Sequence, residues 1–419
     1  MTKTNHNYIV ALVLVSISIF TLFVGYFFNE DPSTGGSQWD FNVTWPLVVD
    51  YSNFNFFDAQ LKYGAKPRHL PLHYIILAGV YKILNDQNFV RLFYLFFSLL
   101  MPIFLYLNLV KIYNTKKIFI LIFSFSFLFF PYFRSSALWP NAHLTALIFF
   151  LISNFFYLKT LGENKFFYKI MNLFFLALST YTLQTYVVLF IFYLYNYFIG
   201  DQKKLFIKLF LFCVFLSVPA LYFLAFNEKM LKLPITQDFF YSIVNNFSII
   251  FFLLLFFILN IHNFKNLLNQ IGNLKKIEIL LILLFFLFIS YNLDYSLLTS
   301  NLRGGGFFFK ISHFLFNNNV IFISSFFFSL FVIFLLIKED FNFFYIIIII
   351  NLMGLNYQIY QKYFEPLFLV MILILFKNSL SKNLISNLSQ VLIFYFMVLS
   401  YYFLSLINLY YGFTTKMSL

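Results

Sequence analysis

Residues 8–28 read YIVALVLVSISIFTLFVGYFF, and residues 29–40, which follow, read NEDPSTGGSQWD. The first stretch carries no charge and is long enough for a helix that crosses a hydrocarbon core about 30 Å thick, which takes about 20 residues. Because no small-residue cleavage site follows Gly25, we interpret it as a retained helix and not as a signal peptide. Apolar runs of this kind recur along the whole chain, and they decide the fold.

The composition has the same meaning. Hydrophobic residues make up 62% of the 419 residues and charged residues only 10%, whereas an ordinary soluble domain has roughly 25% charged residues. We expect an all-α polytopic bundle with about 13 spans (roughly 11 to 13), in one transmembrane domain over 1–419. The expected spans are 8–28, 89–110, 117–133, 142–158, 170–184, 185–199, 205–225, 241–260, 277–292, 318–337, 342–356, 365–377 and 390–409.

The lysines predict the orientation of these spans. With the N-terminus in the cytoplasm, most lysines fall in the short segments on the cytoplasmic side of the membrane, as the positive-inside rule requires. The net charge of +13 is therefore explained by a lipid bilayer partner, and no nucleic-acid partner is expected. This topology predicts an inner or plasma membrane protein whose longest outer loop is 29–88.

Two short helices are expected in that loop, at 41–61 and 71–84. The first has aromatic and aliphatic residues spaced among polar ones, which is typical of a helix lying at the membrane interface. The second begins at Pro71, a favoured first-turn residue, and is too short to span comfortably. Both are interpreted as interfacial, juxtamembrane helices.

Three acids of this loop are candidate catalytic groups. Asp40 lies between Trp39 and Phe41, where partial desolvation suits a carboxylate to general-base chemistry. Glu30 and Asp31 leave the first span directly, and they are alternatives for the same role or for helix capping. A divalent metal such as Mg²⁺ or Mn²⁺ is a possible cofactor, with Asp31 and Asp40 as possible ligands.

A second group of residues is suited to binding phosphate. Arg68, His69 and His73 stand at the start of the short helix, whose free N–H groups favour an anion. A metal pair of the two histidines and a plain interfacial position for His73 are the alternatives. At other outer boundaries the candidates are Arg134 and His143, with snorkelling as the alternative for Arg134, and Lys362 with Tyr363.

The chain resembles the GT-C superfamily of polytopic glycosyltransferases, which use polyprenyl-phosphate-linked sugars, such as the dolichyl-phosphate-mannose and aminoarabinose transferases. The resemblance lies in a first span followed by an outer loop with an acid, then HLPLHYIILAGVYKIL at 69–84, then NFVRLFYLFFSLLMPIFLYL at 88–107. Late in the chain, Lys362, Tyr363 and Pro366 resemble the family's basic-Tyr-Pro pattern before an apolar run.

The resemblance implies a function on the outer face. A sugar would move from a polyprenyl-phosphate donor to a lipid, glycan or protein acceptor by an inverting single displacement. Asp40 would deprotonate the acceptor, with Asp31 and Glu30 as rivals, and Arg68, His69 and Lys362 would contact the donor phosphate. The family's acid usually follows the first span directly and often has a second acid beside it, which matches Glu30-Asp31 better than Asp40.

Two alternative functions are an O-antigen ligase or polymerase and a transporter or flippase for lipid-linked substrates. The ligases usually have their large outer loop late in the chain, whereas here it comes first. Transporters have charges near the middle of their spans, whereas Glu278, Asp294 and Glu365 fall near expected span ends. The glycosyltransferase is therefore favoured.

Overall fold

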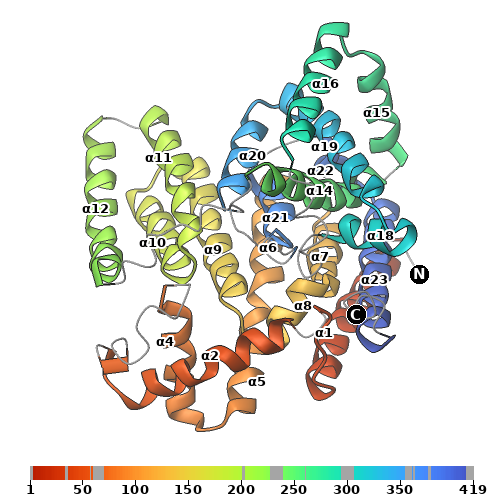
Figure 1. Ribbon diagram of the computed structural model, residues 1–419. Coiled ribbons are helices and arrows are strands. Elements are labelled where there is room, and N and C mark those ends of the chain that lie inside the picture. The colour runs from red at the N-terminus through yellow and green to blue at the C-terminus, as the bar shows by residue number, and fades with distance from the viewer. Residues whose placement is uncertain are drawn as a thin grey trace. The chain divides into compact units, whose positions relative to one another are not determined.

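Every element in the part of the chain that the computed structural model describes is a helix (Figure 1), which confirms the predicted all-α class. The described residues are 3–33, 36–56, 58–59, 70–200, 203–226, 239–259, 261–293, 306–353, 361, 364–375 and 379–411. The α-helices are α1 (Lys3–Phe27), α2 (Gly36–Asn53), α4 (Leu72–Leu84), α5 (Gln87–Ser98), α6 (Leu100–Ile112), α7 (Lys117–Ser126), α8 (Pro131–Leu138), α9 (Ala142–Gly162), α10 (Phe166–Thr182), α11 (Leu189–Gly200), α12 (Lys203–Phe226), α14 (Phe239–Ile258), α15 (Ile261–Gly272), α16 (Lys276–Tyr291), α18 (Phe307–Phe316), α19 (Val320–Glu339), α20 (Asn342–Met353), α21 (Leu367–Leu375), α22 (Ser379–Ile385) and α23 (Leu388–Tyr411). Two short 3₁₀ helices are η1 (Phe127–Phe129) and η2 (Gln184–Val188).

Seven helical stretches among the described residues are long and apolar enough to cross a membrane: Asn7–Phe27, Gln87–Ile112, Ala142–Gly162, Lys203–Phe223, Phe239–Ile258, Val320–Glu339 and Leu388–Tyr410. The number rises to eight if one bent helix pair counts as a single span. Helices of 9 to 17 residues occupy five of the other expected spans, namely α10, α11, α16, α20 and α21. The chain is an integral membrane protein, and the count of about thirteen spans stays a prediction.

The expected span at 117–133 is not one straight helix, and whether it crosses the membrane as a bent span stays a prediction. The helical stretch Lys117–Phe129 ends there, and α8 leaves it at an angle of 71°. Pro131 explains the break, because it has no N–H to donate and it drives the preceding residue out of the helical region. Phe130 accordingly has φ −63° and ψ 123°. Residues 134–138, which we expected in a loop, therefore form the second half of a short helix.

The chain forms two compact units, each built from distant segments. The first unit comprises 1–15, 113–132 and 234–419, and the second comprises 16–112 and 133–233. In the second unit α9 and α10 run side by side (Figure 1). Asn172 Nδ2 on α10 donates to the Ser153 carbonyl on α9 at 3.0 Å, and Tyr197 OH on α11 donates to Asn172 Oδ1 at 3.0 Å. Such mutual bonds satisfy polar groups that apolar surroundings would otherwise penalise.

The first unit has an aromatic core. Phe394 of α23 packs against Phe123 of α7, with ring centroids 4.6 Å apart. Ser248 of α14 and Ser325 of α19 share a hydrogen bond of 2.6 Å between their hydroxyls. Residues 367–374 of α21 are all buried in this unit. Such ring contacts contribute to the packing of these helices.

The segment after α1, in the second unit, contains the two expected helices, one of them with both ends corrected. The helix predicted at 71–84 is confirmed as α4, with Pro71 at its N-cap position. The helix predicted at 41–61 is instead α2, which begins at Gly36. It starts early because side chains of the preceding turn accept its first N–H groups: Ser33 Oγ from Ser37 at 3.0 Å, and Asp31 Oδ2 from Gln38 at 2.8 Å. Asp40 therefore lies inside a helix and not in the turn before it.

Candidate functional site

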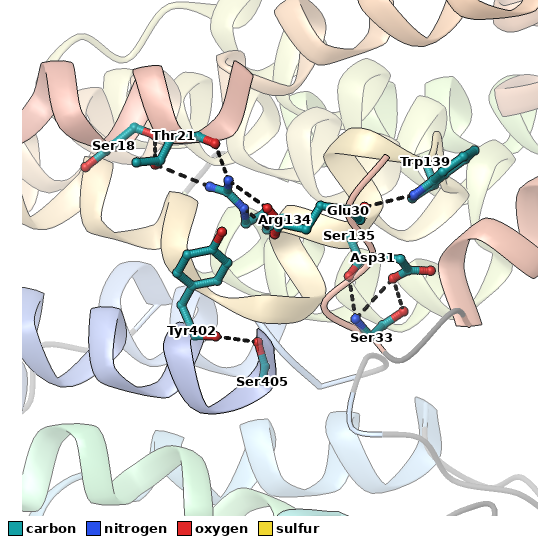
Figure 2. Close-up of polar contacts among 10 residues, drawn as sticks. All are labelled: Ser18, Thr21, Glu30, Asp31, Ser33, Arg134, Ser135, Trp139, Tyr402 and Ser405. Carbon is teal, nitrogen blue, oxygen red and sulfur yellow. Dashed lines mark hydrogen bonds and ion pairs between the residues drawn. The ribbon is translucent and has the colours of Figure 1, made fainter. Parts of the chain in front are cut away.

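A buried ion pair joins the start of the outer loop to α8. Arg134 Nε lies 2.8 Å from Glu30 Oε1, and Arg134 Nη2 lies 3.2 Å from Glu30 Oε2 (Figure 2). The side chains of the two residues are only 1% and 7% exposed. A planar guanidinium that meets both carboxylate oxygens is the strongest geometry for such a pair.

Neutral groups complete this pair. Arg134 also donates to the backbone carbonyl of Thr21 and, at 3.4 Å, to the Thr21 hydroxyl. The indole N–H of Trp139 donates to the Glu30 carbonyl at 3.0 Å. The snorkelling alternative for Arg134 is therefore wrong, because its guanidinium is held inside the protein by a carboxylate 104 residues away in sequence.

Gly25 of α1 has no side chain, and the ion pair occupies the space that a side chain there would fill. A Cβ atom added there would lie 2.7 Å from Glu30 Oε2 and 2.8 Å from Arg134 Nη2. Both atoms are fixed by each other, so neither moves away without weakening the pair. A glycine is needed at this position for close approach and not for its backbone freedom.

We expect Gly25→Ala to lower the melting temperature of the purified protein. Gly79→Ala is the matched control, because Gly79 also lies in a helix and a Cβ there meets nothing within 4 Å. The control should keep or raise the melting temperature, since alanine is favoured over glycine in helices by up to about 1 kcal/mol. Equal melting temperatures for the two variants would show that the close approach at Gly25 is unimportant.

Asp31 has the capping role that was one of its two alternatives. It is 3% exposed, and its Oδ1 accepts from the Ser33 hydroxyl at 2.5 Å and from the Ser33 N–H at 3.1 Å. Its other oxygen, Oδ2, caps α2 by accepting a hydrogen bond from the Gln38 N–H. Ser33 N–H also donates to Ser135 Oγ of α8 at 2.8 Å (Figure 2). The carboxylate of Asp31 thus holds the turn between α1 and α2.

Asp40 has a different setting. It is half-buried on α2, between the exposed Trp39 and the buried Phe41. Burial, and after it the negative charge of Asp40, raises the pKa of the Tyr74 hydroxyl on α4. Asp40 is therefore close enough to α4 to act on a buried side chain there. The two helices also pack through Trp45 and Tyr81, whose ring centroids are 5.2 Å apart.

His73, the residue before Tyr74, connects α4 to α9. It is buried, and its Nδ1 lies 2.9 Å from the hydroxyl of Thr145. The Tyr94 hydroxyl of α5 lies 2.8 Å from the same Thr145 hydroxyl and donates to the Asn141 carbonyl at 2.8 Å. His73 is therefore part of a buried polar network within the protein.

His143 stands in the first turn of α9, two residues before Thr145. Its side chain is half-buried, and its backbone N–H donates to Asn141 Oδ1 at 3.0 Å. Four other predicted site residues, Arg68, His69, Lys362 and Tyr363, lie outside the described residues. The structure thus brings Asp40 and His73 to one helix pair, and it separately brings Glu30 and Asp31 to α8.

A metal does not fit the predicted ligands. Both oxygens of Asp31 accept hydrogen bonds from the turn that it caps. Across the described ranges, no group of three or more His, Cys, Asp or Glu side chains is placed to hold a metal ion. A site for Mg²⁺ or Mn²⁺ needs several oxygen ligands directed at one point.

Sequence reasoning missed the setting of Glu365, in the first unit. We placed it near a span end, but it is 2% exposed and lies just before α21. Its oxygens accept from the Tyr132 N–H at 3.2 Å, from Gln361 Nε2 at 3.0 Å and from Tyr401 OH at 3.1 Å. The four-residue spacing from Gln361 was the available signal, whereas its contact with Tyr132 lies 233 residues away in sequence.

Comparison of the chain with models of known families, with curated proteins and with solved structures finds no significant match. The class of protein therefore follows from the fold and composition. It is an all-helical integral membrane protein with several long apolar helices, and with polar and charged side chains gathered around the segment after α1.

Proposed function

We propose that this protein is a membrane glycosyltransferase of the GT-C type. It moves a sugar from a polyprenyl-phosphate donor to a lipid, glycan or protein acceptor, on the outer face of an inner or plasma membrane. The N-terminus is cytoplasmic in this proposal, because the lysine distribution then obeys the positive-inside rule.

The observation that carries the proposal is the setting of Asp40. It lies on a short helix that follows the first long apolar helix and packs on a second short helix. Of the three acids predicted as bases, Glu30 and Asp31 are buried, and hydrogen bonds engage both oxygens of each carboxylate. Asp40 is half-buried, so part of this residue is exposed to solvent.

The chemistry needs few protein groups. Asp40 takes the proton of the acceptor hydroxyl while the acceptor oxygen attacks the anomeric carbon of the sugar. Polyprenyl phosphate leaves from the opposite side of that carbon. The configuration at the anomeric carbon is inverted in this single step. Because phosphate is a good leaving group, one carboxylate suffices, unlike the paired acids of glycoside hydrolases. Arg68, His69 and Lys362 are proposed to stabilise the leaving phosphate, and the proposal assigns no step to a metal ion.

The proposal is tested with the purified full chain in proteoliposomes. Supplied with radiolabelled polyprenyl-phosphate sugars and a mixed lipid and glycan acceptor pool, the protein should release polyprenyl phosphate and form a product of inverted anomeric configuration. Nucleotide sugars, which carry no lipid, serve as the control donors, and they should give no product. Transfer from nucleotide sugars alone, or no transfer from any polyprenyl-phosphate sugar, would contradict the proposal.

A further inference from the structure

Arg91 is a buried cation that the proposed reaction does not use. It lies in the second turn of α5 and is 4% exposed. Its guanidinium carbon lies 3.6 Å from the centre of the Trp139 ring and 5.2 Å from the centre of the Tyr26 ring. The charge is thus held between two aromatic side chains, an arrangement that attracts a cation to the ring faces.

Two of the three guanidinium nitrogens of Arg91 donate hydrogen bonds, and the third does not. Its Nε donates to the Leu138 carbonyl at 3.2 Å, and its Nη1 donates to Asn29 Oδ1 at 2.9 Å and to Asn88 Oδ1 at 3.4 Å. Its Nη2 is buried without a hydrogen-bond partner. Arginine never loses its proton in proteins, so two N–H groups of a permanent cation are unsatisfied.

Comparison with Arg134 shows what is missing. Both arginines are buried: Arg91 donates to the carbonyl of Leu138, the last residue of α8, whereas Arg134 lies within α8 and has Glu30 as its counter-ion. Arg91 forms no ion pair within the described ranges, and its partners there are two amides and one carbonyl. A buried charge without a counter-ion is strongly unfavourable unless an anion joins it.

We propose that Nη2 of Arg91 binds an anionic oxygen of a phosphate group. Phosphate is the anion that a membrane protein meets at the headgroup level, and guanidinium N–H groups are its preferred donors. The phosphate group would reach Arg91 by passing Tyr26, which is half-buried, and Asn88, which is exposed. The Tyr26 hydroxyl donates to the Asn88 carbonyl at 2.8 Å, and this exposed bond closes over Arg91.

The inference concerns Arg91 and uses none of Arg68, His69 and Lys362. The inference rests on the proposed function only in the choice of polyprenyl phosphate as one probe. It is tested by binding and not by sugar transfer, so a failure of one does not imply a failure of the other.

The experiment measures the melting temperature of the full chain in a phosphate-free detergent. The probes are polyprenyl phosphate, the polyprenol of equal length and inorganic phosphate. We expect polyprenyl phosphate to raise the melting temperature more than polyprenol does, because only the former carries the anion. A rise with inorganic phosphate as well assigns the site to phosphate itself, and no rise with it assigns the site to a lipid-linked phosphate. If neither phosphate probe raises the melting temperature above its control, the inference is overturned, whatever the variants do.

Two variants connect the effect to Arg91. Arg91→Gln should weaken the phosphate-dependent binding by about tenfold or more, the effect of losing a hydrogen bond to a charged group. Arg91→Lys keeps the charge but lacks the second guanidinium nitrogen, and it should give an intermediate affinity. Lys111→Gln is the control, because it removes one positive charge from an exposed position at the end of α6. Wild-type affinity in both Arg91 variants would overturn the assignment.

Discussion

Replacement of Asp40 by Asn should reduce sugar transfer by about 10²- to 10⁴-fold, the range that a positioned general base contributes. The amide has nearly the same size as the carboxylate but does not accept the acceptor proton. Because Asp40 is half-buried and lies within α2, the substitution should leave the fold and the expression level unchanged. The rate is measured with polyprenyl-phosphate sugar in proteoliposomes at matched protein amounts.

Asp58→Asn is the control for this result. Asp58 belongs to the same loop, is exposed, and forms hydrogen bonds with Asn55. The control should transfer sugar at the wild-type rate. Full activity in Asp40→Asn would remove Asp40 as the base and return attention to Glu30 and Asp31, each tested by the corresponding amide.

Glu30→Gln should strongly destabilise the protein. The change leaves the guanidinium of Arg134 buried without its counter-ion, and breaking a buried pair in this way costs about 3–5 kcal/mol. Arg134→Gln should have an effect of similar size, because it leaves the Glu30 carboxylate alone. Both effects are measured as the loss of melting temperature, and of folded protein recovered, in detergent.

A surface pair supplies the matched control. Glu163 and Lys165 form an exposed ion pair at the end of α9, and Glu163→Gln should hardly change the melting temperature. The double variant Glu30→Leu with Arg134→Met removes both charges, so it should be more stable than the sum of the single effects predicts. Additive losses in the double variant would mean that the two side chains do not act as a pair.

Local signals in the sequence predicted the bounds of one of the two short helices after α1. Pro71 and the apolar run behind it predicted α4 to within one residue. For α2 the acceptors of its first N–H groups are Asp31, which we considered for catalysis or for helix capping, and Ser33. The start of α2 was placed five residues too late, because the sequence did not show which N–H groups Asp31 would cap.

The buried charges were the least predictable features. Glu30 and Arg134 were both identified as candidates, but as separate groups facing substrate or solvent. Their pairing depends on the bend at Pro131 and on the space left by Gly25, two features that no periodicity reveals. The same holds for Arg91, whose sequence context shows only an arginine near the start of an apolar run.

The sequence by itself determined that this protein is an all-helical membrane protein, because apolar runs of about 20 residues have no other stable solution in lipid. It also determined which segments carry the polar and charged side chains. Only the tertiary structure decided what each of them does: Asp31 caps α2, Glu30 neutralises Arg134, and Asp40 stays accessible beside α4. The physical reason is that the cost of burying a charge depends on its partners, and those partners lie as far as 104 residues away along the chain.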